Sequence, residues 1–281
     1  MAESLSILQS SYSSCFIDAH SHLTDEVFDK DIADVIAEAQ RIGVKAALVV
    51  SENEAQFNKV ISLADRFPEF VLPCLGVHPV QQDADQARSV NLKDIENVAA
   101  ILERHHERLG AVGEIGLDFT PRFCKADDDK TTQKLVFTQQ VQLAQKYDLP
   151  INVHSRSAGR PTIALLKELG ASRVLMHAFD GKPSVALDGV RAGFYFSIPP
   201  SIVRSQQKDK LVSQLPLENI ILETDSPALG PVKEERNVPA NVTISCDYIA
   251  TVKKIDPKEV RLITTQNAIK LFPKLVKFFA K

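Results

Sequence analysis

Short apolar runs rich in β-branched residues recur along the chain, and each is followed by a longer segment whose apolar residues have helical spacing. The eight runs are 15–23, 45–51, 70–78, 110–118, 150–154, 173–177, 193–198 and 219–225. The amphipathic segments between them are 31–41, 54–67, 92–109, 132–147, 161–169, 183–192 and 208–215, and a further helical region follows the last run. The pattern therefore predicts eight strands that alternate with helices.

This alternation predicts an α/β fold in which the strands are parallel and the connections are right-handed. Eight such units close naturally into a (βα)8 TIM barrel. An open doubly wound sheet is the competing fold, but it usually has fewer units and a glycine-rich phosphate-binding turn, which this sequence lacks. Because no change in composition marks a boundary, residues 15–281 are predicted to form a single domain, and residues 1–14 a mobile N-terminal tail.

Composition narrows the class of protein without deciding its function. The chain has 281 residues, of which 44% are hydrophobic and 25% charged, as in ordinary globular proteins. Its net charge of -3 lacks the basic excess of proteins that coat nucleic acid. The four cysteines form no CxxC pair, no apolar stretch reaches the length of a membrane span, and the first residues do not resemble a secretion signal. We therefore expect an intracellular protein, cytoplasmic or nuclear, that is neither secreted nor bound to a membrane.

Polar residues interrupt five of the eight runs at their carboxyl ends. A buried parallel strand should be apolar on both faces, so an imidazole or a carboxylate there needs a reason. The residues are Asp18, His20 and His22 in the first run, Glu114 and Asp118 in the fourth, His154 in the fifth, His177 in the sixth, and Glu223 and Asp225 in the eighth. In a barrel, the carboxyl ends of all strands surround one mouth, where active sites are built. The sequence thus predicts that these side chains converge.

Four of the seven histidines lie at these strand ends, beside acidic residues. A lone histidine at a strand end is more often structural than a metal ligand, but the joint occurrence favours a metal site. Imidazoles mixed with carboxylates suit a transition metal better than calcium. Six ligands exceed what one tetrahedral zinc ion needs, so a pair of ions bridged by one carboxylate is the economical interpretation. Glu114, on a strand between the two histidine groups, is the natural bridge.

Six motifs occur in the order DAHSHL, GVHP, GEIGLD, INVHSR, MHAF and ETDSP. Together they resemble the TatD family of metal-dependent deoxyribonucleases, which belongs to the amidohydrolase-like barrels. The resemblance runs from Asp18 to the last helices. It implies that His20, His22 and Asp225 hold one metal, that His154 and His177 hold the other, and that Glu114 bridges them. The carboxylated lysine of other amidohydrolase branches is replaced here by Glu114.

The resemblance implies hydrolysis of DNA phosphodiester bonds, by exonuclease or nicking action, with two divalent ions that could be Zn, Mg or Mn. DNA or another phosphodiester is the expected partner, and no obligate protein partner is evident. In this hypothesis Asp225 accepts a proton from the attacking water, and His78 and Glu223 steer the leaving group. Glu223 could instead pair with a basic residue behind its strand.

Three further residues match positions that would reach the substrate or brace the mouth: Arg156, Arg236 and Asn237. For each arginine, a structural salt bridge is an equally good interpretation.

Two rival functions use the same residues. The first is an amidohydrolase-like enzyme that cleaves a small-molecule ester, lactone or amide. The second is a non-catalytic scaffold that retains a metal site, for which we would expect lost ligands. All six ligand positions are intact, which favours an enzyme.

Overall fold

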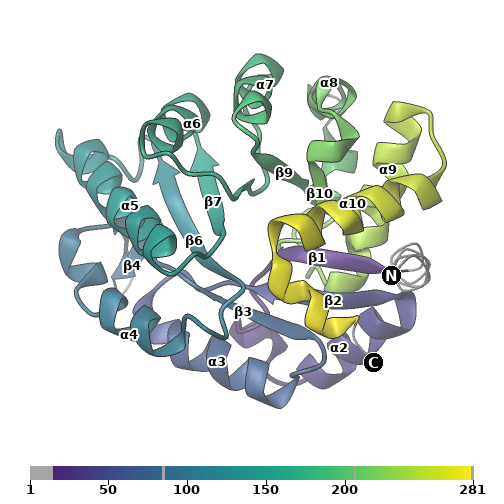
Figure 1. The fold of residues 1–281 in the computed structure, drawn as a ribbon, viewed down its shortest axis with the longest axis horizontal. Helices are drawn as coiled ribbons and strands as arrows, with labels where there is room; N and C mark the ends of the chain where they lie inside the picture. Colours follow the sequence, from purple (N-terminus) through teal and green to yellow (C-terminus); the bar gives the residue numbers. More distant parts are fainter. Residues whose placement is uncertain (1–14, 84–85, 206, 280–281) are drawn as a thin grey trace.

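The computed structural model describes residues 15–83, 86–205 and 207–279, so the predicted tail at 1–14 lies outside the described residues. Eight parallel strands surround a central axis and helices cover their outer side (Figure 1). The strands are β1 (Phe16–Ser21), β2 (Val44–Val49), β3 (Val71–Leu75), β6 (Ala111–Asp118), β7 (Ile151–Arg156), β8 (Val174–Met176), β9 (Tyr195–Ile198) and β10 (Ile220–Leu222), neighbours in that order. The predicted (βα)8 TIM barrel is confirmed.

Helices occupy each of the predicted connecting segments. They are α2 (Ile32–Ile42), α3 (Phe57–Arg66), α4 (Val98–His105), α5 (Asp129–Lys146), α6 (Gly159–Glu168), α7 (Pro183–Arg191), α8 (Gln207–Gln214), α9 (Val242–Lys253) and α10 (Pro257–Leu271). The local sequence explains where several of these helices begin or end. Gly43 ends α2 in a left-handed conformation and donates its N–H to the last turn. Asp256 caps α10, with proline at the first helical position.

The barrel closes where the last strand meets the first. Just beyond β10, the Asp225 N–H donates to the His20 carbonyl at 2.9 Å, and the His22 N–H donates to the Ser226 carbonyl at 2.7 Å. Lower down, the Asp18 carboxylate accepts hydrogen bonds from the backbone and the hydroxyl of Thr224. These bonds place the first and last predicted metal-ligand segments side by side.

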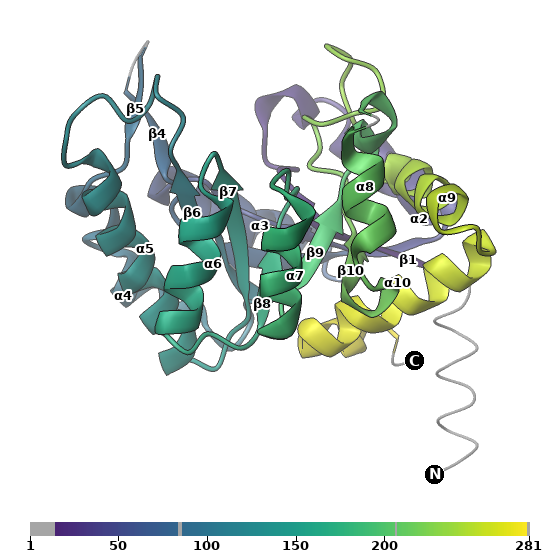
Figure 2. The ribbon, with the colours of Figure 1, turned by 90° about the horizontal axis from the view of Figure 1, so that it is seen from above.

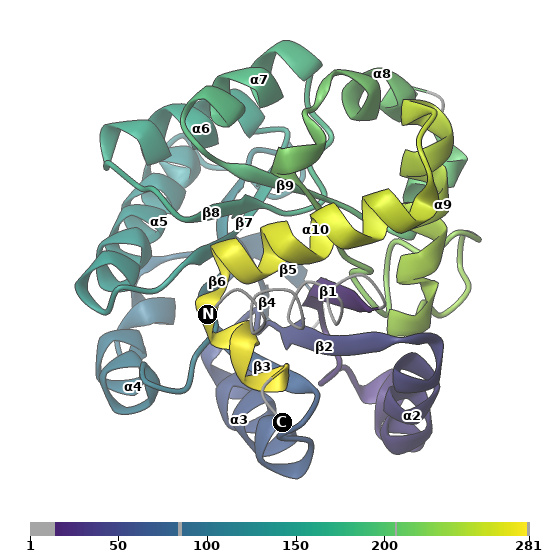
Figure 3. The same cartoon turned by 45° about the vertical axis from the view of Figure 1, so that its right-hand side comes forward.

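Two apolar layers hold the barrel. One lies between the strands and the surrounding helices. The other fills the barrel interior below the mouth, where Ile17, Leu48 and Leu72 meet Phe272 and Leu275 from the C-terminal segment. Helix α10 crosses this end of the barrel (Figure 3). Because the amino end of the barrel is plugged with apolar side chains, the polar site can open only at the carboxyl end of the strands.

The structure differs from the sequence prediction in a few places. An unpredicted hairpin of β4 (Val80–Asp83) and β5 (Gln86–Ser89) follows the third strand and stands at the end of the barrel opposite α10 (Figure 2). The segment 92–109, predicted as one helix, is a short 3-10 turn at Leu92–Ile95 followed by α4, because Asn91 and Asp94 form a capping box at the turn. Within the described residues, no helix has the length and apolar character needed to span a membrane.

Candidate metal centre

The mouth of the barrel brings all six predicted metal ligands together. His20 lies within β1, Glu114 within β6 and His154 within β7, whereas His22 and His177 directly follow their strands and Asp225 lies a few residues beyond the end of β10. Five of the six are less than a tenth exposed, and the His22 side chain is 16% exposed. Buried imidazoles and carboxylates at this density require either mutual hydrogen bonds or a bound cation.

One set of ligand atoms has the spacing that a single small cation requires. His20 Nε2 lies 3.5 Å from Glu114 Oε2 and 3.4 Å from Asp225 Oδ1, and His22 Nε2 lies 3.4 and 3.3 Å from the same two oxygens. The two imidazole nitrogens are 3.2 Å apart. Metal–ligand bonds of about 2.0–2.1 Å in a tetrahedron put the ligand atoms roughly 3.3–3.4 Å apart. These four side chains therefore fit a transition-metal ion.

The other oxygen of Glu114 faces the second pair of histidines. Glu114 Oε1 lies 2.9 Å from His154 Nδ1 and 3.8 Å from His177 Nε2. The rings of His154 and His177 are 6.5 Å apart between centroids, so this set is wider than the first. A third imidazole, His78, contributes Nε2 at 3.7 Å from the same oxygen. Each carboxylate oxygen of Glu114 thus faces a different group of imidazoles.

A hydrogen bond behind His20 fixes which of its nitrogens faces the site. The Asn152 amide group donates to the Ala19 carbonyl at 3.0 Å, so its oxygen, 2.9 Å from His20 Nδ1, must accept the imidazole proton. His20 Nε2 then presents a lone pair toward Glu114 and Asp225. Asn152 is fully buried and was missed from sequence, although it lies two residues before His154 on the same face of its strand.

Two carboxylates fix the orientation of His154 and His177 in the same way. Glu223 accepts from His177 Nδ1 at 2.8 Å, and Asp118 lies 3.1 Å from His154 Nε2. Such partners fix the tautomer and the ring orientation of a histidine ligand. Asp118 had been noted at the end of its strand but was given no role in the site.

The position of Glu223 corrects the role predicted for it. It is fully buried and also accepts hydrogen bonds from the Ala178 N–H and the Ser197 hydroxyl. With both oxygens engaged behind His177, it does not face a leaving group. Among the described residues it forms no ion pair with a basic side chain behind the strand, because strand alternation directs it to His177 instead.

Electrostatics keep two carboxylates ionised and raise the pKa of two of the histidines. Burial opposes charge on Glu114 and Asp225, but the surrounding imidazoles hold the pKa of each below its usual range. Burial likewise opposes protonation of His22 and His154. The carboxylates outweigh it and raise the pKa of His22 to about 10, chiefly through Asp225, and that of His154 to about 9, through Asp118 and Glu114. Without a cation, the imidazoles of His22 and His154 are therefore protonated, and a bound metal would displace these protons.

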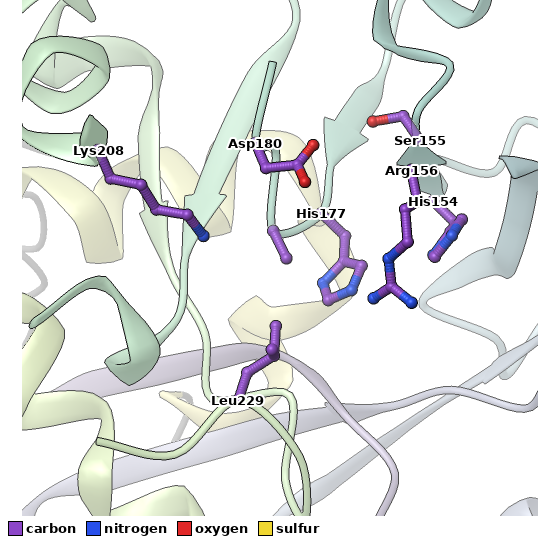
Figure 4. Close-up of a pocket in the computed structure, with 8 residues that line it drawn as sticks. His154, Ser155, Arg156, His177, Asp180, Lys208 and Leu229 are labelled. Atoms are coloured by element: carbon purple, nitrogen blue, oxygen red, sulfur yellow. The ribbon is translucent and has the colours of Figure 1, made fainter. Parts of the chain in front are cut away.

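The remaining sequence-predicted residues divide into two groups. Arg156 is exposed at the end of β7 and lines two cavities at the mouth. It shares one with His154 and His177 (Figure 4) and the other with His78. His78 is buried edge-on against the ring of His154, with 4.3 Å between centroids. Both residues therefore lie at the mouth, and their contacts with a substrate stay predictions.

Arg236 and Asn237 make hydrogen bonds within the protein instead; Arg236 is exposed and lines a cavity with Leu229, whereas Asn237 is buried. Arg236 donates to both oxygens of Asp31 and to the Val27 carbonyl. Asn237 is 1% exposed, and its amide donates to the carbonyls of Thr224 and Ala228. These bonds brace the loop after β10, which is the second of the two roles that the sequence offered for Asn237; its contact with substrate stays a prediction. For Arg236, the salt-bridge interpretation describes the structure.

Unusual backbone conformations gather around the same mouth. Ser157, Ala178, Asp225 and Leu229 all have positive φ, between 41° and 57°, after strands β7, β8 and β10. Residues with side chains adopt this conformation at a cost that surrounding structure must offset, and such residues cluster at functional sites. Positive φ angles at these four residues cannot be predicted from residue types alone.

Comparisons with known proteins point to one family. A family model described as TatD related DNase matches residues 17–273. The chain is 56% identical over 260 residues to the human protein named Deoxyribonuclease TATDN3, covering 92% of this chain and 95% of that protein. It is 33% identical to the Bacillus subtilis protein YabD, named as an uncharacterized metal-dependent hydrolase, over 91% of this chain and 98% of that one. The crystal structure of the Escherichia coli TatD homologue YJJV superposes with a TM-score of 0.82 at 26% identity, covering 93% and 99% of the two chains.

Proposed function

Because this chain belongs to the family of TatD related DNases, we propose that it hydrolyses phosphodiester bonds in DNA with two divalent cations bound at the mouth of the barrel. The proposed ligands are His20, His22 and Asp225 for one ion, His154 and His177 for the other, and Glu114 for both. Zn, Mn and Mg are the candidate ions, with the imidazole-rich ligand set favouring a transition metal.

The two-sided placement of Glu114 is the observation that carries this proposal. Its Oε2 lies 3.4 and 3.5 Å from the imidazole nitrogens of His22 and His20, and its Oε1 lies 2.9 Å from His154. A carboxylate that faces two groups of imidazoles with different oxygens is the arrangement expected of a bridge between two ions. A site for one ion would not require the second group of imidazoles, those of His154 and His177.

The bound ions would lower the pKa of a water molecule toward neutrality and polarise a phosphoryl oxygen. The protein supplies the other functions. The neighbouring imidazoles lower the pKa of Asp225 and so keep it ionised, and in this form the carboxylate can accept a proton from the water. Arg156, free at the edge of the mouth, can bind a phosphate oxygen, and its guanidinium geometry suits that contact.

The cavities at the mouth support a polymeric substrate. Arg156 lines both a cavity of about 290 Å³ beside His78 and a central cavity of about 70 Å³ beside the metal ligands. Leu229 lines the central cavity and also a third of about 470 Å³. The small central cavity thus lies between two larger ones, as expected if a phosphate sits over the metals and a nucleoside lies on either side.

The test is cleavage of labelled single- and double-stranded DNA by purified protein with Mg, Mn or Zn. We expect cleavage by the wild type, and none by Glu114→Ala or Asp225→Ala, with metal content falling in Glu114→Ala while the fold is retained. His105→Ala removes a histidine on the outer helix α4 and should leave cleavage intact. Normal turnover and normal metal content in Glu114→Ala would contradict the assignment.

A further inference from the structure

The central cavity at the mouth is lined by more than metal ligands. Figure 4 shows the ammonium group of Lys208 directed toward His177 from one side and the guanidinium of Arg156 from the other. Asp180 and Leu229 complete this part of the wall. Its volume of about 70 Å³ is far below the roughly 300 Å³ at which pockets enclose a whole small ligand. The cavity suits one phosphoryl group, which would meet a cation on either side.

Hydrolysis of a phosphodiester also calls for a proton, and the residues considered so far do not supply it. The oxygen that leaves phosphorus departs as an alkoxide, a strong base; bound cations would lend it positive charge, and a side chain that protonates it would add to that effect. Glu223 is engaged behind His177, and His78 lines the neighbouring cavity rather than this one. The proton donor must therefore be sought among the groups that line the central cavity.

The ionisable groups that line the central cavity differ in their ability to release a proton. His154 and His177 have their ring nitrogens directed at carboxylates and, in the proposed function, at metal ions. Arg156 holds its protons too strongly to act as an acid. Lys208 has three ammonium protons, and within the described part of the chain no hydrogen bond or ion pair holds its side chain.

The surroundings of Lys208 suit proton release. Its ammonium is largely removed from solvent, and this burial lowers the pKa of Lys208 below its ordinary value. The charged groups that act on it are Asp180 and Glu223, which favour the protonated form, and Arg204 and Arg156, which disfavour it. A lysine with a depressed pKa can donate a proton, and a neighbouring carboxylate such as Asp180 can relay a proton back to it from solvent.

We propose that Lys208 is a further catalytic residue, which protonates the leaving oxygen of the phosphodiester. In this step the oxygen of water forms a bond to phosphorus, the bond between phosphorus and the leaving oxygen breaks, and a proton passes from Lys208 Nζ to that oxygen. The proton lost by water goes to Asp225, and solvent returns a proton to Lys208. The products are a phosphomonoester and an alcohol. The inference rests on the proposed function.

Two substrates separate proton donation from phosphate binding. DNA has an alkoxide leaving group, whereas the p-nitrophenyl ester of thymidine 5′-monophosphate releases p-nitrophenolate, which needs no proton. Lys208→Ala removes the donor, and Lys208→Arg retains a positive charge but holds its protons too strongly to act as an acid. We expect kcat for DNA to fall about 100-fold or more in both variants, the size of a general-acid contribution, with kcat for the nitrophenyl ester nearly unchanged.

Lys210→Ala, which removes an exposed lysine from the same helix, should leave both rates unchanged. Melting temperature and metal content should match the wild type in every lysine variant. Equal losses on both substrates, or DNA cleavage retained by Lys208→Arg, would overturn proton donation and identify Lys208 as a phosphate-binding residue. If metal-loaded wild-type protein cleaves neither substrate, the proposed function itself fails.

Discussion

At the scale of single residues, the site depends on partners that hold the metal ligands in place. Three of the four histidines proposed as ligands have a polar partner on the nitrogen that faces away from the proposed ions: Asn152 for His20, Glu223 for His177 and Asp118 for His154. Such partners typically change metal affinity or activity 10- to 100-fold when they are removed. A residue that positions a ligand can therefore be recognised by weaker metal binding, whereas a residue that contacts the substrate should change KM.

Glu223→Ala should weaken metal binding by roughly 10- to 100-fold, because His177 loses the acceptor that fixes its tautomer. Competition against a metal-binding dye measures this affinity, and activity should return when excess metal is added. Glu234→Ala, which removes an exposed carboxylate on the loop after β10, serves as the matched control. Unchanged affinity together with lost activity at saturating metal would favour the direct role with the leaving group.

Arg156 and Arg236 should behave differently although both had been predicted to reach the substrate. Arg156→Ala should raise KM for DNA with little change in melting temperature, because its guanidinium faces the cavities of the mouth. Arg236→Ala should lower the melting temperature more than Arg156→Ala and raise KM less, because its guanidinium is held by Asp31 although the side chain lines the third cavity. Steady-state kinetics and thermal unfolding of the two variants test the assignment. The reverse pattern would contradict it.

At the scale of elements, the register of β6 on β7 sets the spacing of the second histidine group. Gly116 pairs with His154, and a Cβ at this glycine would lie 2.1 Å from the His154 carbonyl oxygen. Its φ of 151° also disfavours a side chain. Glu114 and Asp118, two residues away on either side, contact the ring of His154. The glycine therefore permits two strands to approach closely where their side chains must share one histidine.

Gly116→Ala should lower both thermal stability and metal content, because relief of the clash must separate β6 from β7. Gly170→Ala is the matched control: that glycine also has positive φ, but a Cβ there meets nothing within 4 Å. The control should cost only about 1 kcal/mol from backbone strain and should retain its metal. Equal effects of the two substitutions, by calorimetry and metal analysis, would show that the clash is relieved without moving the strands.

Strand and helix identities could be predicted from the sequence because each barrel unit repeats the same hydrophobic pattern. The position of the ligands followed from the rule that strand ends share one mouth. The β4–β5 hairpin was missed since Val80–Asp83 and Gln86–Ser89 are short and mostly polar. Asn152 and Glu223 could not be assigned because their partners are distant in sequence: His20 lies 132 residues from Asn152, and His177 lies 46 from Glu223. Such pairs depend on register, which a pattern does not specify.

At the scale of the whole molecule, metal binding should be coupled to protonation and to stability. The pKa values of His22 and His154, raised to about 10 and 9, mean that both imidazoles carry protons near pH 7 in the metal-free protein. A metal must displace those protons, so affinity should rise with pH from about 6.5 toward 9. The protonated imidazoles stabilise the metal-free fold below about pH 6.5, and this contribution is lost as pH rises through 9 and 10.

The increase in melting temperature caused by metal should therefore grow between pH 6.5 and 8.5. Thermal unfolding with metal and with EDTA, at several pH values, measures this difference directly. Calorimetry in two buffers with different ionisation enthalpies should detect at least one proton released per protein molecule at pH 7.5. Binding that releases no proton and does not vary with pH would mean that both imidazoles are neutral before the metal arrives.

The balance of charge over the molecule predicts how DNA binding depends on salt. The chain carries a net charge of -3, so its attraction for a polyanion must come from the mouth, where Arg156 and Lys208 line the central cavity. Each phosphate neutralised by a cationic side chain contributes a slope of about -0.7 to a plot of log K against log salt for single strands. With these two cationic contacts, the slope should be shallow, about -1.4, and Arg156→Ala should reduce it by about 0.7. Fluorescence anisotropy with a labelled oligonucleotide and inactive Asp225→Ala protein measures the slope without cleavage. A steep slope, or one that Arg156→Ala leaves unchanged, would place the phosphate contacts elsewhere on the surface.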